Sequence, residues 1–474
     1  MNSINKKTLL ALGLAASIWA GCDKQTVSHN GPSEVVVTTP DKTKLFEKQQ
    51  TLEASLSENE EQVQHITIDT SKVYQEIDGF GFTLTGGSAY HINRMSPEAR
   101  QQLLEELFGT KDGQVGFSYL RISVAASDLD FETYSYDDLP EGVETDPELK
   151  YFTLAKARED LIPVLKDILK IFPELKIMGS PWSPPTWMKT NGDTRGGELK
   201  PEFYGAYADY LVKYLEKMEE EGIHIDALTI QNEPLHPGNN PSLLMHPEDQ
   251  AEFIKNHLGP KIREAALSTK LIAYDHNADR PDYPITILND EEANQYVDGS
   301  AFHLYGGTID ALSEVHEAHP DKNIYFTEQW IGAPGNFSKD IRWHTRELII
   351  GGTRNWSRTV LEWNLAADSK LEPYTDRGGC NQCLGAITID GDTVTRNPAY
   401  YIIAHASRYV RPGAVRVESN IPDHLPNVAF KTTDNKVVQI VLNDSDVDKQ
   451  FDVNYGETKR QFKLEAGSVM TIVW

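Results

Sequence analysis

Along the middle of the chain, short β-rich runs alternate with segments of helical periodicity. Most of these runs are apolar on both faces, which is typical of strands in a parallel sheet that helices cover. Eight such units in about 330 residues predict a (β/α)8 barrel, an α/β fold of the TIM-barrel type. The predicted strands are Gly79–Thr85, Phe117–Val124, Leu175–Trp182, Ala227–Glu233, Leu271–His276, Gly299–Tyr305, Ile324–Trp330 and Thr359–Leu365.

The segments between the runs are amphipathic and predict helices. Ser96-Pro97-Glu98 and His246-Pro247-Glu248 place a proline and an acid in a first helical turn. An open doubly wound sheet is the alternative fold, but it usually carries a G-x-G-x-x-G loop, and after Gly79-Phe-Gly81 the third glycine is replaced by Leu84. The predicted helices are Pro97–Leu107, Ala155–Ile171, Pro201–Glu221, Pro247–Ala265, Ser338–Ile350 and Pro398–Val410.

After about Pro412 the pattern changes to short alternating strands with turn residues between them, which predicts an all-β module. A similar strand, Val63–Asp69, precedes the barrel and is expected to complete the sheet of this module. The predicted organisation is therefore an N-terminal sandwich strand at 63–78, a barrel at 79–410 and a β-sandwich at 411–474. The predicted C-terminal strands are Val415–Glu418, Val428–Lys431, Val437–Leu442, Phe451–Tyr455, Phe462–Leu464 and Val469–Trp474.

The sequence pattern at the N-terminus is typical of a targeting segment. Two lysines precede the apolar run Thr8–Trp19, and Ala20-Gly21-Cys22 follows, which is the layout of a secretory signal. The run is shorter than the ~20 apolar residues that span a bilayer. Because Cys22 directly follows Ala-Gly, residues 1–22 resemble a bacterial lipoprotein signal, and an ordinary cleaved signal is the alternative. We expect lipidation at Cys22, a polar tether at 23–62, and a lipoprotein of the bacterial cell envelope at the outer membrane or cell surface.

Composition excludes several partners and scaffolds. The chain has 45 Lys and Arg against 71 Asp and Glu, a formal net charge of −26, so nucleic acid and anionic lipid surfaces are poor partners. Its 3 cysteines are too few for a disulfide-built scaffold or a four-thiolate zinc site. Outside the cytoplasm, Cys380 and Cys383 most simply form a local disulfide in a Gly-rich loop, whereas a redox or zinc site would need further elements.

Candidate chemistry lies at the C-terminal ends of the predicted strands, where barrels build their active sites. Glu233 and Glu328 each end an apolar strand, and aromatic side chains flank them. A buried carboxylate is costly, and a pair beside Trp and Tyr is what cleavage of a glycosidic bond requires. This chemistry needs no cofactor or metal; H-E-x-x-H and G-x-S-x-G motifs are absent from the sequence. The other polar and aromatic candidates are Arg121, Asp128, Trp182, Asn232, His303, Tyr305 and Trp363.

Longer motifs at the same strand ends carry a family resemblance. They are Asp78-Gly-Phe-Gly-Phe82, Leu120-Arg-Ile-Ser123, Ser180-Pro-Trp-Ser-Pro-Pro-Thr-Trp-Met-Lys-Thr-Asn-Gly192, Gln231-Asn-Glu-Pro234, Phe326-Thr-Glu328 and Glu362-Trp-Asn-Leu365. From about residue 63 to the C-terminus the chain resembles glycoside hydrolase family 30, whose retaining barrels carry a catalytic glutamate at the ends of strands four and seven. The resemblance also implies that the segment before the barrel completes the sandwich.

The resemblance implies a role for each candidate. Glu233 would be the general acid/base and Glu328 the nucleophile, and Asn232 would bind the 2-hydroxyl of the sugar. Arg121 and Tyr305 would lower the pKa of Glu328, while the pKa of the acid/base would be raised. Asp128, Trp182 and Trp363 match the positions at which members of the family bind the sugar in the −1 subsite. His303 would line the same subsite.

The segment after the nucleophile, Gln329–Phe337, looks like the microbial branch of the family, which includes β-1,6-glucanases. We therefore expect a monomeric endo-β-1,6-glucanase that acts on a polysaccharide or oligosaccharide. The alternatives are a β-glucosidase or glucosylceramidase-like enzyme, a xylanase or fucosidase of the same family, and a non-catalytic carbohydrate-binding lipoprotein. A binding protein for transport fits less well, because the eight units do not divide into two lobes.

Overall fold

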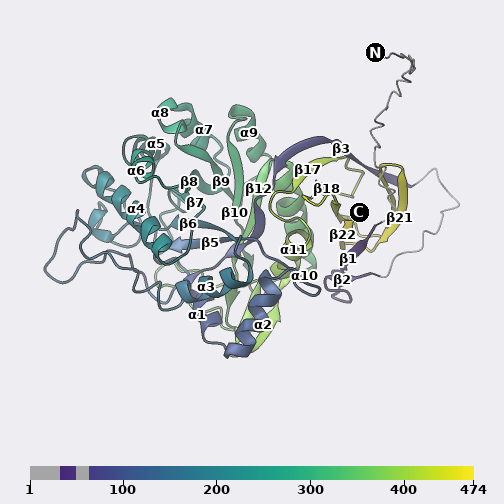
Figure 1. The fold of residues 1–474 in the computed structure, drawn as a ribbon, viewed down its shortest axis with the longest axis horizontal. Coiled ribbons are helices and arrows are strands. Elements are labelled where there is room, and N and C mark those ends of the chain that lie inside the picture. The colour runs from purple at the N-terminus through teal and green to yellow at the C-terminus, as the bar shows by residue number, and fades with distance from the viewer. Residues whose placement is uncertain (1–31, 50–62) are drawn as a thin grey trace, which may run out of the picture.

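The computed structural model describes residues 32–49 and 63–474, which form a closed barrel of parallel strands beside a β module (Figure 1). The predicted fold class is confirmed, and each predicted run overlaps one barrel strand. The predicted signal and Cys22 lie outside the described residues. Strand β12 pairs with β4 and closes the sheet. In chain order around the barrel, the strands are β4 (Gly79–Thr83), β5 (Tyr119–Val124), β6 (Lys176–Pro181), β7 (Ala227–Thr229), β8 (Lys270–Ala278), β9 (Val297–Gly307), β10 (Asn323–Glu328) and β12 (Ser357–Asn364).

An apolar layer fills the lower part of the barrel. It is formed by inward-facing side chains near the start of seven strands, all of them buried. Because side chains alternate along a strand, the next inward layer is made by the residues two positions further on. The apolar layer consists of Tyr119, Met178, Ala227, Ile272, Ala301, Tyr325 and Leu361.

The predicted helices are present, and two of them are shorter or interrupted at prolines. Ser96 caps α2 by accepting a hydrogen bond from the amide of Ala99, and Pro97 is the first helical residue. The helix predicted from Ala155 begins only at Leu161, because Pro163 cannot donate the amide that a longer helix would need. The six predicted segments contain α2 (Pro97–Phe108), α3 (Leu161–Ile171), α4 (Tyr204–Glu220), α5 (Pro247–Phe253) with α6 (Gly259–Glu264), α10 (Phe337–His344) and α11 (Pro398–Ser407).

Shorter elements complete the barrel domain. Two π-helical segments, Ile254–Leu258 and Thr345–Gly352, continue α5 and α10. None of the helices formed by the described residues combines the length and apolar character that crossing a membrane requires. Helices that the sequence pattern did not predict are α1 (Gly86–Asn93), α7 (Asp282–Asn289), α8 (Glu291–Asn294) and α9 (Ala311–Ala318), with a 3-10 turn at Thr186–Met188. A second 3-10 turn, Pro201–Phe203, forms the start of the predicted helix Pro201–Glu221. The short strands are β11 (Ile331–Gly332), β13 (Ala366–Ala367), β14 (Cys383–Leu384), β15 (Ile387–Asp390) and β16 (Thr393–Arg396).

The β module is built from both ends of the described chain, so purple and yellow strands lie together in Figure 1. Its strands form one nine-stranded sheet that folds over a common apolar core. The long strand β3 pairs with β17 on one side and with β20 on the other. The order in the sheet is β2 (Glu47–Lys48), β1 (Glu34–Thr38), β22 (Val469–Val473), β19 (Val437–Leu442), β18 (Asn427–Lys431), β17 (Val415–Ser419), β3 (Gln64–Glu76), β20 (Lys449–Tyr455) and β21 (Thr458–Leu464).

The prediction of a polar tether at 23–62 is wrong for residues 32–49, the part of this range that the structure describes. Residues 34–38 form β1, which pairs with β22 along its whole length, and residues 47–48 pair back onto β1. Val35, Val36 and Val37 are all buried. Three β-branched residues in succession suit a strand covered on both faces, and such a strand shows no alternation from which it could be recognised.

Candidate active site

The layer above the apolar residues of the barrel is polar. Two residues beyond Tyr119 lies Arg121, two beyond Ala301 lies His303, and Leu361 is followed in the same way by Trp363. Ser180, Thr229 and Thr327 have the same relation to Met178, Ala227 and Tyr325. Strand alternation therefore directs a ring of hydrogen-bonding groups into the barrel, just below its C-terminal rim.

Asp275 is the centre of this ring, and the sequence pattern did not predict it. It is completely buried, and each of its oxygens accepts several hydrogen bonds. Its Oδ2 accepts from Arg121 at 2.8 Å and from two hydroxyls, and its Oδ1 accepts from His303 Nε2 at 3.0 Å and from Thr327 at 2.7 Å. Against the effect of burial, Arg121 and His303 hold the pKa of Asp275 well below its ordinary value, so it is a fixed negative charge.

A break in strand β8 directs Asp275 inward. Tyr274 and Asp275 both have positive φ angles, 71° and 75°, and the pairing of β8 with β9 shifts register between Tyr274 and His276. Ala273 and Tyr274 consequently both pack in the core outside the barrel, and the inward position after Ile272 falls to Asp275. Bulges of this kind re-aim a side chain next to an active site.

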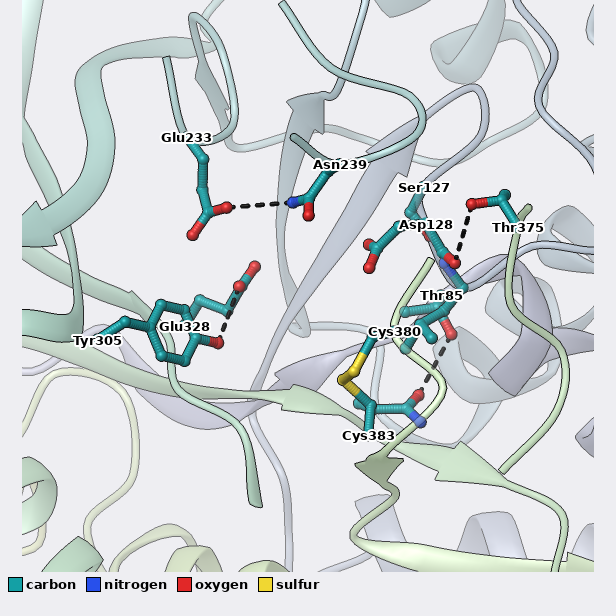
Figure 2. Close-up of a disulfide and its surroundings, with 12 residues drawn as sticks. Thr85, Ser127, Asp128, Glu233, Asn239, Tyr305, Glu328, Thr375, Cys380 and Cys383 are labelled. Atoms are coloured by element: carbon teal, nitrogen blue, oxygen red, sulfur yellow. Dashed lines mark hydrogen bonds between the residues drawn. A yellow bond between two sulfur atoms is a disulfide. The ribbon is translucent and has the colours of Figure 1, made fainter. Parts of the chain in front are cut away.

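Glu328, the last residue of β10, accepts two hydrogen bonds through different oxygens. Arg121 Nη1 donates to its Oε2 at 2.6 Å, and the hydroxyl of Tyr305 donates to its Oε1 at 3.0 Å (Figure 2). The second nitrogen of Arg121 donates to Asn232 Oδ1 at 2.6 Å. The predicted contacts of Arg121 and Tyr305 with Glu328 are therefore present, and Arg121 also orients the asparagine that precedes Glu233.

Glu233 follows β7 in a strained conformation, with a φ of 46°. Its Oε2 accepts a hydrogen bond from Asn239 at 3.1 Å (Figure 2), and its Oε1 lies 3.2 Å from Nδ1 of His303. Since Nε2 of His303 faces the ionised Asp275, this nitrogen carries a proton. The contact between Nδ1 and Glu233 therefore contains one proton that either group can hold.

The pKa shifts at the two glutamates differ from those expected. Burial raises the pKa of Glu328 against the opposing charges of His303 and Arg121. The pKa of Glu233 is lowered to about 2, because the hydrogen bond and charge of His303 outweigh burial. Although burial lowers it, the charges of Glu328, Asp275 and Glu233 raise the pKa of His303 to about 9. The Glu233–His303 pair therefore retains its proton through the neutral range, and the imidazole holds it.

The two glutamates and His303 are close together. One ligand atom of each, a carboxylate oxygen or Nδ1/Nε2, lies within 4.8 Å of the others. Such a triad is also able to surround a cation, but Arg121 already supplies a positive charge to Glu328 and His303 is bonded to Glu233. The arrangement suits proton transfer between two carboxylates that face one small space.

An open cavity of about 340 Å³ lies over these carboxylates. Asp128 and Trp363 line it, and Trp182 stacks at an angle on Trp363 with ring centres 5.4 Å apart. Burial and the charges of Glu328 and Glu233 raise the pKa of Asp128 to about 8. The cavity also has a rim whose residues the sequence pattern did not predict, and Trp330 lines the cavity too. The unpredicted lining residues are His236, Asn239, His276 and Asn277.

Trp187, which lies in the Ser180–Gly192 motif, is a core residue. Its indole N–H donates to the backbone oxygen of Asp137 at 3.3 Å and to its carboxylate at 3.2 Å, and its ring packs on Phe203. Cys380 and Cys383 form a disulfide and both line the cavity. Of the predicted residues, Asp128, Trp182, Glu233, Tyr305, Glu328 and Trp363 line this cavity. Arg121 and His303 contact the two glutamates, and Asn232 accepts a hydrogen bond from Arg121. Asp275 and the rim residues were not predicted.

Comparisons with known proteins agree with this arrangement. The family model for the glycosyl hydrolase family 30 TIM-barrel domain matches residues 77–410, and the model for the family 30 beta sandwich domain matches residues 413–472. The chain is 36% identical over 368 residues to endo-1,6-beta-D-glucanase neg1 of Aspergillus fumigatus, covering 73% of each chain. It is 31% identical to putative glucosylceramidase 1 of Caenorhabditis elegans, over 80% of this chain and 76% of that protein. The solved structure of the endo-beta1,6-glucanase BT3312 has a TM-score of 0.85 and 36% identity, over 93% of this chain and 98% of that one.

Proposed function

Since the chain belongs to glycosyl hydrolase family 30, it is a glycoside hydrolase, and we propose that it cleaves β-1,6-linked glucan with retention of configuration. One observation carries the stereochemistry: an oxygen of Glu233 and an oxygen of Glu328 lie within 4.8 Å of each other. Retaining enzymes hold their carboxyl groups about 5–5.5 Å apart, whereas inverting enzymes leave room for a water at about 6.5–9.5 Å. The similarity to two proteins named as endo-β-1,6-glucanases supports the linkage.

In the first step, Glu328 attacks the anomeric carbon and Glu233 gives its proton to the departing glycosidic oxygen. The glycosidic bond breaks, an ester bond forms between the sugar and Glu328, and the leaving chain departs as an alcohol. In the second step, Glu233 takes a proton from water, whose oxygen attacks the same carbon and releases Glu328. Two inversions at one carbon give net retention.

The pair Glu233–His303 supplies the proton for the first step. The proton rests on Nδ1 of His303 before the reaction and moves along the 3.2 Å contact to Glu233 as the leaving oxygen develops charge. Asp275 keeps Nε2 of His303 protonated, so that Nδ1 is the nitrogen that exchanges the proton. Arg121 and Tyr305 stabilise the carboxylate that Glu328 regains when the ester is hydrolysed.

Three groups are proposed to bind the sugar at the cleavage point. Asp128 presents a buried carboxyl to the cavity, and Trp363 presents an aromatic face. The indole N–H of Trp182 is buried and has no hydrogen-bond partner among residues 32–49 and 63–474. A buried donor without a partner is costly, and a sugar hydroxyl that enters the cavity would satisfy it.

A glucosylceramidase-like activity is the second candidate, favoured by the 31% identity to a protein named as a putative glucosylceramidase. A panel of β-1,6-, β-1,3- and β-1,4-glucans, xylan and glucosylceramide separates the two. We expect oligosaccharides from β-1,6-glucan alone, with the new end in the β configuration when followed by NMR. Glu328→Gln is the control, because it should bind glucan and lose turnover by about 10³-fold or more. Release of product only from glucosylceramide or xylan, or inversion of configuration, would refute the proposal.

We also propose that the chain is an exported lipoprotein anchored at Cys22, acting as a monomer on glycan at the cell envelope. The support is the sequence pattern of residues 1–22. Fatty-acid labelling in a bacterial host should be lost in Cys22→Ala, while export persists because the apolar run is intact. Labelling that survives the substitution would contradict the anchor, and light scattering of the chain without residues 1–22 measures the oligomeric state.

A further inference from the structure

We propose that the disulfide-closed turn Cys380–Cys383 is a positioning element of the active site, which holds the carboxyl of Asp128 in place relative to Glu328. This inference rests on the proposed function, since it assigns a role to one wall of that same cavity. Figure 2 shows the disulfide beside Asp128, with Glu328 facing the same space. Both cysteines line the cavity, and Cys383 is only 3% exposed, packed with Trp182 and Trp363.

The turn contacts Asp128 directly. The backbone amide of Cys380 faces the Asp128 carboxyl and lowers the pKa of that group against the effect of burial, and the amide of Thr375 donates a hydrogen bond to the Asp128 carbonyl at 3.0 Å. Both the carboxyl and the backbone of Asp128 are therefore held by the segment that contains the disulfide. An amide that points at a carboxyl positions it only if its own turn is fixed, and the S–S bond fixes this turn.

The other side of the turn is joined to the segment that follows Glu328. Strand β14 begins at Cys383 and pairs with β11, with Gly332 opposite Cys383. The amide of Ala333 donates to the carbonyl of Gln382 at 2.8 Å. The disulfide therefore links the contact with Asp128 to a strand that begins three residues after the nucleophile.

The same loop reaches the segment after Glu233. Asn240 donates hydrogen bonds to the carbonyl and the carboxylate of Asp376, each at 2.9 Å. A Cβ atom at Gly378 would lie 2.5 Å from the carbonyl oxygen of Gly238, so only glycine permits this close approach. One loop thus touches the three segments that carry Asp128, Glu233 and Glu328.

The placement of this disulfide argues against a general role in stability. Its cysteines are 3 positions apart, and in the chain-entropy model the stabilisation by a disulfide grows with the length of the loop that it closes. So short a loop restricts the unfolded chain least. What the bond does restrict is the orientation of the Cys380 amide, and hence of the group that this amide contacts.

A double-mutant cycle tests the proposal on the mature chain. Cys380→Ser/Cys383→Ser is combined with Asp128→Asn, and kcat/KM on β-1,6-glucan is measured for all four proteins. We expect the serine pair to lower kcat/KM about tenfold when Asp128 is present and by less than about twofold in the Asp128→Asn background. Equal effects in the two backgrounds would overturn the proposal, because a purely structural disulfide acts independently of Asp128.

Arg377→Gln is the matched control in the same loop. Arg377 is exposed and pairs with Asp193 at 3.1 Å, away from Asp128. Loosening the loop at this point should leave kcat/KM nearly unchanged in both backgrounds, whereas an effect as large and as coupled as that of the serine pair would overturn the assignment to the disulfide.

If the serine pair fails to fold, reduction of the wild-type protein replaces it. A dithiol reductant delivers two electrons and two protons to the S–S bond and closes to its own cyclic disulfide. Reduction should lower kcat/KM of the wild type about as much as the serine pair is expected to, and it should leave kcat/KM of Asp128→Asn nearly unchanged.

The experiments can refute the proposed substrate without refuting the positioning role, and the reverse. If the wild type releases nothing from β-1,6-glucan, the proposed substrate is wrong. The double-mutant cycle is then measured with a different reaction, the rate at which an activated 2-deoxy-2-fluoro-β-glucoside labels Glu328 in each of the four proteins. This labelling needs no β-1,6 linkage. Additive rates of labelling across the four proteins would overturn the positioning role, and coupled rates would support it.

Discussion

Replacing Asp275 by asparagine tests whether this buried carboxylate determines the protonation of the Glu233–His303 pair. Asparagine has the same shape but offers one oxygen and one NH2 group. Because Arg121 and two hydroxyls donate to Oδ2, the oxygen of the amide must stay on that side. The NH2 group then faces Nε2 of His303, which lies 3.0 Å from Oδ1 in the wild type.

The substitution reverses the hydrogen bond at Nε2. This nitrogen must now accept, so the single proton of a neutral imidazole moves to Nδ1 and points at Glu233. Above the lowered pKa of His303 in the variant, Glu233 can then only accept from it, and the pair holds no proton to donate. The first step loses its general acid, although Glu233, Glu328 and His303 are all present.

The magnitude follows from the pKa of His303, which rises from the ordinary 6.5 to about 9. A shift of about 2.5 pH units corresponds to roughly 3 kcal/mol, and the carboxylates of Glu328, Asp275 and Glu233 produce it against burial. Removing one of the three should move the basic limb of kcat/KM downward by about one pH unit or more. Breaking the buried pair should also cost about 3 kcal/mol of folding stability, with Arg121 still paired to Glu328.

The sign of the pH effect on stability is fixed by the same shift. A histidine whose pKa is raised in the folded state contributes stability that is complete below pH 6.5 and is lost as the pH rises through about 9. Asp275→Asn removes part of that contribution. The loss of stability should therefore be larger at pH 6 than at pH 9, as measured by urea unfolding at both pH values.

The assay compares aryl glycosides of a β-1,6-linked glucose disaccharide that differ in their leaving groups. A dinitrophenolate departs without a proton, whereas a poor leaving group needs the general acid, which is worth about 10²–10⁴-fold. We expect Asp275→Asn to lose about 10²-fold or more with the poor leaving group and little with dinitrophenolate. Asp130→Asn is the control, since Asp130 is a buried acid that accepts from Ser127 outside the catalytic set. Equal losses with both leaving groups, or an unchanged basic limb, would refute the reasoning.

Three further outcomes follow from the site. Glu233→Ala should slow the turnover of poor leaving groups by about 10²–10⁴-fold, and added azide should restore turnover as a β-glycosyl azide that NMR identifies. Trp182→Phe keeps the aromatic face but removes the unpaired N–H, so kcat/KM should fall about tenfold in steady-state assays with glucan, and an unchanged value would exclude a hydrogen bond to the sugar. Because burial raises the pKa of Asp128 from 3.8 to about 8, this carboxyl destabilises the fold progressively as the pH rises from 3.8 to 8. The melting temperature of Asp128→Asn should therefore exceed that of the wild type by more at pH 8 than at pH 5.

The barrel was predictable because its strands are apolar on both faces and have polar residues at one end. Glu328 illustrates this: the run Ile324–Trp330 overlaps β10, and the glutamate is the last residue of that strand. Helix α2 was equally plain, since Ser96 and Pro97 mark its start. Helix α1 was not, because Gly86–Asn93 begins with two glycines, which are poor helix formers, and its cap is a threonine at the end of a strand motif.

Pairing between distant segments accounts for the remaining misses. The strand at residues 34–38 is stable only because β22, more than four hundred residues later, pairs with it. The rim residue Asn239 comes from the loop after β7, and its contact with Glu233 depends on how that loop turns back. Local propensity predicts neither the strand at 34–38 nor the contact of Asn239 with Glu233, since both depend on the tertiary fold.

Asp275 shows where a period-two argument succeeds and where it fails. Counting two residues beyond the apolar layer identifies Arg121 and His303, and it would identify Thr327 as well. On β8 the same count gives Tyr274, which packs outside the barrel, because two successive residues with positive φ shift the inward position by one. Non-glycine residues adopt such angles at a cost of about 1–3 kcal/mol, so a sequence pattern gives no sign of them. The strain is offset by the hydrogen bonds that Asp275 accepts, which means that the bulge and the charge centre stabilise each other. A substitution that relaxes the bulge should therefore disturb the Glu233–His303 proton even where it touches neither residue.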